Sequence, residues 1–413
     1  MARAETFFLL KSQKKISISK KISVLFFTLI FALFFNQNLY SEIIKDNDFG
    51  FSLDIPEGYE LSEDSEDGMS FLFSHPNIPV NFVLKITTEN SKSDSYDVLK
   101  RSLNKLSAQY EIASFDWLEQ KCSISTLKTE IDRKYEGWAV CTPLKIQNSF
   151  LTLLCYAPSS LNGECEQFII STLNSLSLDF VQNQKESGIF VSYAFPKEGD
   201  CPLSLKIAGK TVNTKADKCD FEASQFVVDL EFSVFKLYAN HKLWKEAWIR
   251  YYRRIYNDCV SRLMNVSNDI YRELWDYAKQ KNPKNPDIAF AQFLLSWVQN
   301  FDYQREQTKD SADFTPLVQV LKGKGNDCDS RSMLIAVLLN NLGYDTIMLI
   351  SREYSHAMVA TEIAASGQKY YLKEKNKEYI LGETTAKVTW GMIAQDKSDR
   401  TKWIPVIFND FEE

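Results

Sequence analysis

The chain has 413 residues, which is too long for a single compact core and favours two or three domains. Its hydrophobic content of 45% and charged content of 25% are typical of folded globular proteins and exclude a largely disordered chain. The formal net charge is -6, although six Lys or Arg and one Glu give the first 41 residues a local charge of +5. No basic stripe interleaved with aromatic residues offsets the acidic remainder, so we expect no nucleic-acid partner.

The N-terminus has the pattern of an export signal. Five lysines precede Ile22–Phe35, a mostly apolar run of fourteen residues. This run is shorter than the roughly 20 residues of a membrane-spanning helix and fits the core of a signal peptide. We therefore predict a signal peptide at 1–41, with an uncleaved anchor as the alternative, and an exported protein that is periplasmic or extracellular. An envelope or membrane-proximal partner fits this location, and the oligomeric state is left open.

Eight cysteines in an exported chain favour disulfide bonds. Spacing does not fix their connectivity, but six fall in neighbouring couples: Cys122 with Cys141, Cys155 with Cys165, and Cys201 with Cys219. Cys259 lies in a helical run and is interpreted as a small core residue. Cys328 has polar neighbours on both sides, so we do not interpret it as a core residue.

Residues 46–181 are predicted to form an α+β module of alternating strands and two helices, the helices at 96–110 and 165–176. His75 stands beside Pro76 and is interpreted as a turn residue, and the module has no catalytic cluster. Its opening residues, 51–59, and closing residues, 168–173, resemble PsbP-like domains of exported proteins. This resemblance implies a binding or scaffolding role.

Residues 187–258 are predicted to be a β-rich segment that leads into a helix. Strands are expected at 188–195, 203–207 and 226–238, and the period becomes helical from Leu243. An aromatic stripe then follows at helical spacing: Trp244, Trp248, Tyr251, Tyr252, Ile255 and Tyr256. Such a stripe is most often core packing, so we assign it no chemistry. Further helices are expected at 260–278 and 287–300.

The candidate nucleophile is Cys328. A Gly-spaced loop, Gly323–Asp327, delivers it to the start of an apolar helix that Gly343 ends. Asn326 is the expected N-cap of this helix, and Asp329 is its expected capping-box partner. Free backbone N–H groups and the helix dipole at this position favour the thiolate form of the cysteine.

A histidine and an acid follow on successive predicted strands. His356 is placed to take the thiol proton, and Glu383 is placed to orient the imidazole. The Cys328 backbone N–H and the Gln299 side chain are candidate oxyanion donors. The alternatives are a buried thiol, a satisfied strand histidine and a solvated loop acid. A zinc site is disfavoured because one Cys and one His lack the paired spacing of such sites, and no cofactor is expected.

Gly323–Asp329, the apolar helix that ends at Leu342–Tyr344, and the later histidine and acid resemble the bacterial transglutaminase-like cysteine protease superfamily. The resemblance covers roughly residues 260–390. It implies a papain-like α+β fold for a domain at 259–413, with Cys328, His356 and Glu383 as the triad. The family usually has Asp where Glu383 stands, and Glu can make the same hydrogen bond.

Two classes of function follow from these residues. The resemblance implies an exported thiol-dependent hydrolase or acyltransferase that acts on peptide or amide bonds of a peptide or protein substrate, with hydrolysis favoured. The alternative is a non-catalytic peptide- or protein-binding module on the same fold. For the whole chain we predict an α+β protein with an N-terminal sheet-and-helix module, a β-rich middle segment and a papain-like transglutaminase-type domain.

Overall fold

The computed structural model describes residues 43–89, 92–179, 187–304, 312–323 and 326–408. The signal peptide expected at 1–41 lies outside these residues. The described chain combines helices with antiparallel sheets, which confirms the predicted α+β class. None of the helices in the described part is both long and apolar enough to cross a membrane.

The described residues divide into two compact units. Unit 1 contains residues 43–179 together with Gly188–Tyr193 and Leu237–Ala247. Unit 2 contains Ala194–Lys236 and the described residues from Trp248 onward. The residues of the expected middle segment, 187–258, are therefore shared between the two units.

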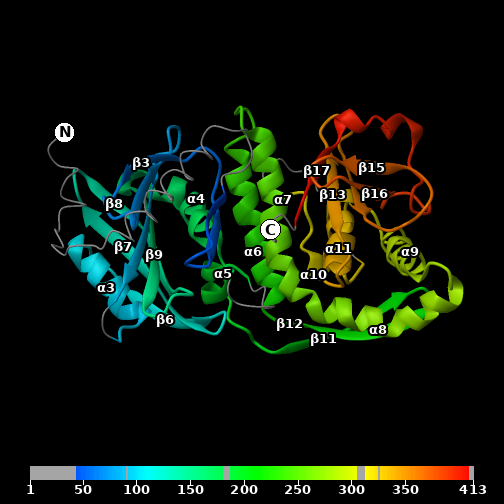
Figure 1. Cartoon of the computed structure of the whole chain (residues 1–413), viewed down its shortest axis with the longest axis horizontal. Coiled ribbons are helices and arrows are strands. Elements are labelled where there is room, and N and C mark those ends of the chain that lie inside the picture. Colours follow the sequence, from blue (N-terminus) through cyan, green and yellow to red (C-terminus); the bar gives the residue numbers. More distant parts are fainter. Residues whose placement is uncertain (1–42, 90–91, 180–186, 305–311, 324–325, 409–413) are drawn as a thin grey trace. The chain divides into compact units, whose positions relative to one another are not determined.

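A seven-stranded antiparallel sheet forms the centre of unit 1, in the order β3-β4-β5-β9-β8-β7-β6 (Figure 1). Its strands are β3 (Glu60–Asp64), β4 (Ser70–Ser74), β5 (Asn81–Thr88), β6 (Ile112–Trp117), β7 (Gln120–Glu130), β8 (Lys134–Pro143) and β9 (Ser149–Pro158). The buried strands β8 and β9 carry apolar side chains on both faces, since both faces are covered.

Two helices cover the sheet of unit 1. Val98 and Leu99 of α3 (Ser95–Lys105) share a core with Val83 on one face. The neighbouring strand residue Phe82 points to the other face, where its ring and that of Phe168 in α4 (Asn162–Asn174) both contact Tyr59. A smaller sheet, in the order β1-β2-β10, completes the unit with β1 (Ile43–Asp46), β2 (Phe51–Asp54) and β10 (Leu176–Leu178).

Leu237–Ala247 belongs to unit 1 because its polar groups bond there. The Tyr238 hydroxyl donates to the Glu57 carbonyl at 2.6 Å, and His241 Nε2 lies 3.3 Å from the Asn77 amide nitrogen. His75 Nδ1 accepts from the backbone N–H of Asn77 and of Ile78, at 3.2 and 3.0 Å. His75 therefore acts as a structural group of a turn, as the sequence indicated.

Unit 2 is built around helix α11 (Cys328–Asn340), which packs on the inner strands of a five-stranded antiparallel sheet in the order β15-β16-β14-β13-β17. The strands are β13 (Thr346–Ser351), β14 (His356–Thr361), β15 (Lys369–Leu372), β16 (Lys377–Gly382) and β17 (Ile404–Val406). Nearly every side chain of α11 is buried, which explains why the helix is apolar on all sides.

The other helices of unit 2 surround α11 and a β-hairpin. They are α6 (Asp220–Lys236), α7 (Trp244–Arg262, in this unit from Trp248), α8 (Met264–Lys281), α9 (Pro286–Val298) and α10 (Leu317–Val320). The hairpin of β11 (Asp200–Ile207) and β12 (Lys210–Asp217) packs against α8. One apolar core contains side chains from all of these elements.

Two predicted strands of the middle segment are helices instead. Residues 188–195 contain the short helix α5 (Ile189–Ala194), and residues 226–238 lie mostly in α6. The buried residues Ala223, Val227 and Val234 of α6 recur at helical spacing, so they form one buried stripe of a helix. Tertiary packing thus outweighs the strand preference of the β-branched residues that suggested a strand.

The expected disulfide couples are not bridged, and all eight cysteines are free thiols. The strand register explains the first couple. Cys141 lies opposite Ser123, so Cys122 on the adjacent position points to the other face of the sheet and contacts Thr142 at 3.3 Å. Two cysteines on opposite faces of one sheet cannot be joined without moving the backbone.

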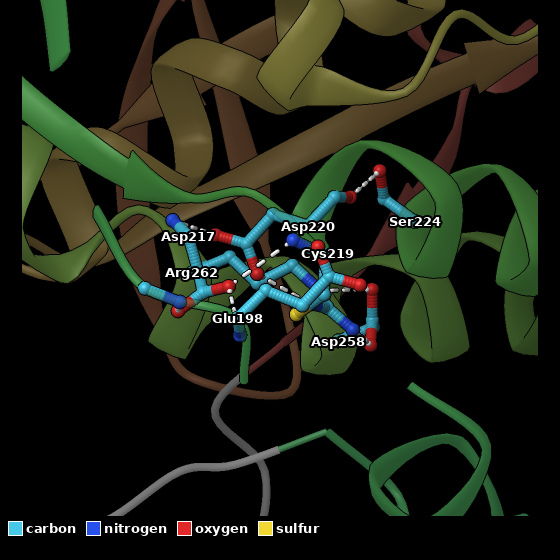
Figure 2. A network of polar contacts seen from close by, with 8 residues as sticks. Glu198, Asp217, Cys219, Asp220, Ser224, Asp258 and Arg262 are labelled. Atoms are coloured by element: carbon cyan, nitrogen blue, oxygen red, sulfur yellow. Dashed lines mark hydrogen bonds and ion pairs between the residues drawn. The ribbon is translucent and has the colours of Figure 1, made fainter. Parts of the chain in front are cut away.

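A buried ionic network fastens α6 to α7 (Figure 2). Arg262 binds both oxygens of Asp258, each at 2.9 Å, and reaches Asp220 at 2.6 Å. Asp220 also accepts from the backbone N–H of Asp217, while Asp217 accepts from Cys219. Because the guanidinium and both of its partners are matched, the network stabilises the junction and leaves no group aimed at a ligand.

Candidate functional site

The loop before α11 differs from its expected form by one residue. Asp327, and not Asn326, is the N-cap: its carboxylate accepts from the Ser330 N–H at 3.0 Å and from the Ser330 hydroxyl at 2.9 Å. Asn326 instead accepts a hydrogen bond from Arg331. Cys328 is consequently the first residue of the helix and lies in its first turn, as the sequence predicted.

The Cys328 thiol is buried among acids. The side chain is 2% exposed, and its Sγ donates to Asp329 Oδ1 at 3.1 Å. Burial raises the pKa of the Cys328 thiol well above its ordinary value, and the carboxylates of Asp329 and Asp327 raise it further. The backbone N–H of Ala357 opposes this effect only in part. The expectation of a favoured thiolate is therefore wrong for this arrangement, because burial of the thiol, together with the two acids, outweighs the effect of the helix start.

Asp329 is fixed from a second direction. Its Oδ2 accepts a hydrogen bond from the hydroxyl of Tyr252, a residue of the aromatic stripe in α7. Burial raises the pKa of Asp329, although the bonds from Tyr252 and Cys328 and the charge of His356 lower it. The stripe from Trp248 to Tyr256 packs in the core as predicted, but Tyr252 also reaches the candidate site, which the sequence interpretation missed.

His356 and Glu383 form a buried pair. His356 opens β14, and its Nε2 lies 2.8 Å from Glu383 Oε2. Burial alone would raise the pKa of Glu383, but the hydrogen bond and charge of His356 and the bonds from Thr385 lower it to about 2. Glu383 is thus ionised at neutral pH, as an imidazole-orienting group requires. The rings of His356 and Trp403 meet in an edge-to-face arrangement, with centroids 6.2 Å apart.

The backbone around both residues is held in place. Ser355, directly before His356, has a φ of 45°, a left-handed conformation that is uncommon for a residue with a side chain. After β16, Glu383 Oε1 accepts from the N–H of Thr385 at 2.9 Å and from its hydroxyl at 2.6 Å. Both carboxylate oxygens of Glu383 are therefore engaged.

Gln299 does not have the geometry of a free oxyanion donor. Its Nε2 donates to the backbone carbonyl of Glu383 at 2.8 Å and to that of Val388 at 3.0 Å. The amide is therefore used to hold the loop that carries the acid. The oxyanion role expected for Gln299 is replaced by a structural one.

Arg331 links the three segments of the site. Its guanidinium donates to the Phe301 carbonyl at 2.8 Å and to the Thr384 carbonyl at 3.3 Å, and Nε bonds Asn326. The sequence interpretation gave Arg331 no role. A charged residue in an otherwise buried apolar helix is a usable signal, since such a charge must be paired.

The predicted residues are thus brought together in part. His356 and Glu383 are joined directly, and Cys328 faces the backbone amide of Ala357, the neighbour of His356. The hydrogen bond of the Cys328 sulfur goes to Asp329, and none joins it to His356 in the described chain. Within the same residues, no cluster of three or more His, Cys, Asp or Glu side chains has the arrangement of a metal site.

Comparisons with known proteins add little about this site. No protein-family model matches the sequence. No curated protein matches it either.

Several solved structures match about a third of the chain. The PsbP protein CyanoP from Synechocystis sp. PCC 6803 is 13% identical, with a TM-score of 0.29 over 35% of this chain and 95% of that one. LpqN of Mycobacterium tuberculosis, involved in cell envelope biogenesis, is 13% identical, with a TM-score of 0.24 over 33% and 86%. The Ran-binding protein Mog1p of Saccharomyces cerevisiae is 7% identical, with a TM-score of 0.26 over 34% and 96%. The chain therefore has a weak PsbP-like resemblance, and none of these three is a transglutaminase-like protein.

Proposed function

We propose that this protein is an exported thiol-dependent hydrolase or acyltransferase that acts on peptide or amide bonds through Cys328, His356 and Glu383. The observation that supports it most is the buried His356–Glu383 pair at 2.8 Å, beside the start of the helix that carries the thiol. Burying an imidazole and a carboxylate is costly unless they pair, and the pair meets that requirement next to a nucleophile. The resemblance of Gly323–Asp329 to the transglutaminase-like cysteine protease superfamily supports the same function.

The chemistry divides among the three side chains. Glu383 accepts the Nε2–H of His356, which leaves Nδ1 as the basic nitrogen. Nδ1 takes the proton of Cys328, and the sulfur attacks the carbonyl carbon of the substrate amide. The imidazolium then gives its proton to the leaving amine, so the C–N bond breaks and a thioester remains. Water, or an amine, releases the acyl group and restores the thiol.

The alternative is a non-catalytic peptide- or protein-binding module. The hydrogen bond from Cys328 to Asp329 favours it, because the bond and the raised pKa of the sulfur retain the thiol form. A protein that only binds would keep the same fold without forming a thioester. The two functions therefore differ in whether a covalent adduct forms on the sulfur.

Alkylation rates test the proposal, with Cys259 as an internal control. Cys328 and Cys259 are each 2% exposed in unit 2, so burial alone predicts equal, slow reaction with iodoacetamide. We expect Cys328 to react at least about tenfold faster at pH 7.5, because an adjacent imidazole can take its proton. His356→Ala should remove this advantage, as measured by peptide mass spectrometry of the labelled chain.

A covalent intermediate is the second readout. Intact-mass analysis after incubation with a mixed peptide pool should show an acyl adduct on Cys328. The Cys328→Ser variant should show no such adduct. Equal, slow alkylation of Cys328 and Cys259, together with no adduct, would leave the binding module as the function.

A further inference from the structure

A chain of three groups extends from the candidate nucleophile into the core of unit 2. Cys328 Sγ donates to Asp329 Oδ1 at 3.1 Å, and the Tyr252 hydroxyl donates to the other oxygen, Oδ2. Tyr252 is itself fixed, since its ring is 2% exposed and packs against Tyr251 and Phe314. Both carboxylate oxygens of Asp329 are thus used, one by a rigid anchor and one by the sulfur.

We infer that Asp329, anchored by Tyr252, is a positioning residue that holds the Cys328 side chain and keeps the proton on its sulfur in the substrate-free protein. The inference rests on the proposed function, since it concerns the resting form of the same nucleophile. Asp329 lies where the capping-box partner was expected, yet its carboxylate bonds a thiol and a phenol and does not cap the helix. A helix cap is instead supplied by Asp327.

The charged groups around Cys328 explain why removing one charge should change the ionisation of its thiol. The start of α11 contributes Asp327 and Asp329, α7 contributes Tyr252, the preceding loop contributes Asp313, and β14 contributes His356. The acids favour the neutral thiol, whereas the guanidinium of Arg331, one turn along α11, and the imidazole of His356 are the basic side chains that interact with this cluster. Removing the Asp329 charge therefore shifts the balance toward transfer of the proton to His356.

The same contact defines how the thiol would be released. When a substrate carbonyl displaces the hydrogen bond from sulfur to Oδ1, the S–H proton passes to His356 Nδ1 and the electron pair stays on sulfur. Asp329 retains the hydrogen bond of Tyr252 and gains no proton. No oxidant or further reactant enters this step.

The test is the pH dependence of alkylation at Cys328 in the full chain. Asp329→Asn keeps the shape of the side chain but removes its charge, and a carboxylate so close shifts a neighbouring pKa by one unit or more. We expect the midpoint of the rate profile to fall by at least about one pH unit. At pH 7.5 the rate should then rise about tenfold.

Asp287→Asn is the matched control. Asp287 holds the hydroxyl of Tyr344 at 2.7 Å, so it forms the same kind of Tyr–Asp pair in the same unit. Tyr344 follows the far end of α11, roughly 20 Å along the helix from Cys328. This variant tests the loss of a Tyr–Asp bond without the charge beside the sulfur, and its alkylation profile should match that of the unaltered chain.

The unaltered chain provides a measurement that needs no variant to fold. Its Cys328 should alkylate with a midpoint above the ordinary thiol value of about 8.5. A midpoint well below that value would overturn the role of Asp329. So would an Asp329→Asn profile that coincides with the Asp287→Asn profile.

The two proposals fail in different ways. If His356→Ala slows alkylation but Asp329→Asn leaves the midpoint unchanged, the catalytic proposal stands and the role of Asp329 falls. If Asp329→Asn lowers the midpoint while His356→Ala has no effect, Asp329 controls the thiol of a protein that does not use His356.

Discussion

Glu383 is the residue on which the geometry of the candidate site most depends. One of its oxygens holds the imidazole of His356 and the other is held by Thr385, while Gln299 supports its backbone carbonyl. Each bond fixes a different part of the same residue. Replacing one carboxylate oxygen of Glu383 by an amide nitrogen should therefore change both the stability of unit 2 and the reactivity of the site.

Glu383→Gln tests this dependence through pH. The pKa of Glu383 is lowered to about 2 in the folded protein from an ordinary value of 4.5, so its stabilisation is present above about pH 4.5 and is lost as the pH falls toward 2. We expect Glu383→Gln to reduce the free energy of unfolding of unit 2 by roughly 3 kcal/mol at pH 7 and by much less at pH 3. Urea unfolding, followed by alkylation of the buried Cys259, measures this difference.

Glu378→Gln is the control for that measurement. Glu378 pairs with Lys369 on the exposed surface of the same unit, at 2.8 Å. A surface pair contributes about 0–1 kcal/mol, so this substitution should change stability little at either pH. Equal effects of the two substitutions at pH 7 would contradict the structural role assigned to Glu383.

The contact between His356 and Glu383 could be predicted from the sequence, but the state of the Cys328 thiol could not. Cys328, His356 and Glu383 were recognised by their order and by the loop before α11. Whether Cys328 is a thiol or a thiolate depends on the orientation of Asp329 and on Tyr252, which is 77 residues away in the chain. No local pattern encodes such a contact.

At the scale of secondary structure, the end of β16 controls where the acid lies. Gly382 pairs with Val359 and directly precedes Glu383. A Cβ at Gly382 would lie 2.6 Å from the ring of Trp390 and 2.9 Å from a methyl of Val359. The small residue therefore lets Trp390 pack over the strand that delivers Glu383.

Gly382→Ala should destabilise unit 2 by about 1–3 kcal/mol, because both the Trp390 ring and Val359 must shift. The urea midpoint for Cys259 alkylation measures the loss. Gly163→Ala in α4 of unit 1 is the control, measured by alkylation of the buried Cys155 of the same unit, since a Cβ at Gly163 meets nothing within 4 Å. A Gly-to-Ala change with open space should leave stability unchanged or raise it slightly. A Gly382→Ala variant as stable as the unaltered chain would show that Trp390 does not pack closely against β16.

Elements with a clear hydrophobic period were predicted well, whereas a helix rich in β-branched and aromatic residues was not. The strands around His356 and the helix after Cys328 follow their sequence patterns closely. α6 was mistaken for a strand because its valines and phenylalanines favour strands. Its helical state depends on burial against α7 and β12, which are partners that only the tertiary structure brings to it.

At the scale of the molecule, the two units have separate cores. The core beneath α3 contains side chains of unit 1 alone, and the core around α11 contains side chains of unit 2 alone. Cys155 is buried in unit 1 and Cys259 in unit 2, so the two thiols report on the two units separately.

Gly137→Ala should therefore unfold one unit without the other. A Cβ at Gly137 would lie 2.1 Å from the carbonyl oxygen of Cys155 on the paired strand. The backbone of β9 would have to move to relieve this clash. We expect the urea midpoint for Cys155 alkylation to fall, by the equivalent of at least about 2 kcal/mol, while that for Cys259 stays constant. Gly382→Ala should give the reciprocal pattern. A common shift of both midpoints would show that the units unfold together.

The interleaving of the chain limits how this protein can be divided. A recombinant fragment that begins at Trp248 would omit β12, whose Val212 shares a core with Ile270 and Leu274 of α8. A fragment that begins at Asp200 would retain that strand, but it would also retain Leu237–Ala247 without the Glu57 carbonyl that Tyr238 binds. No single cut in the gene yields both units intact, so an exchange of one unit for another protein's domain would need at least two cuts in the chain.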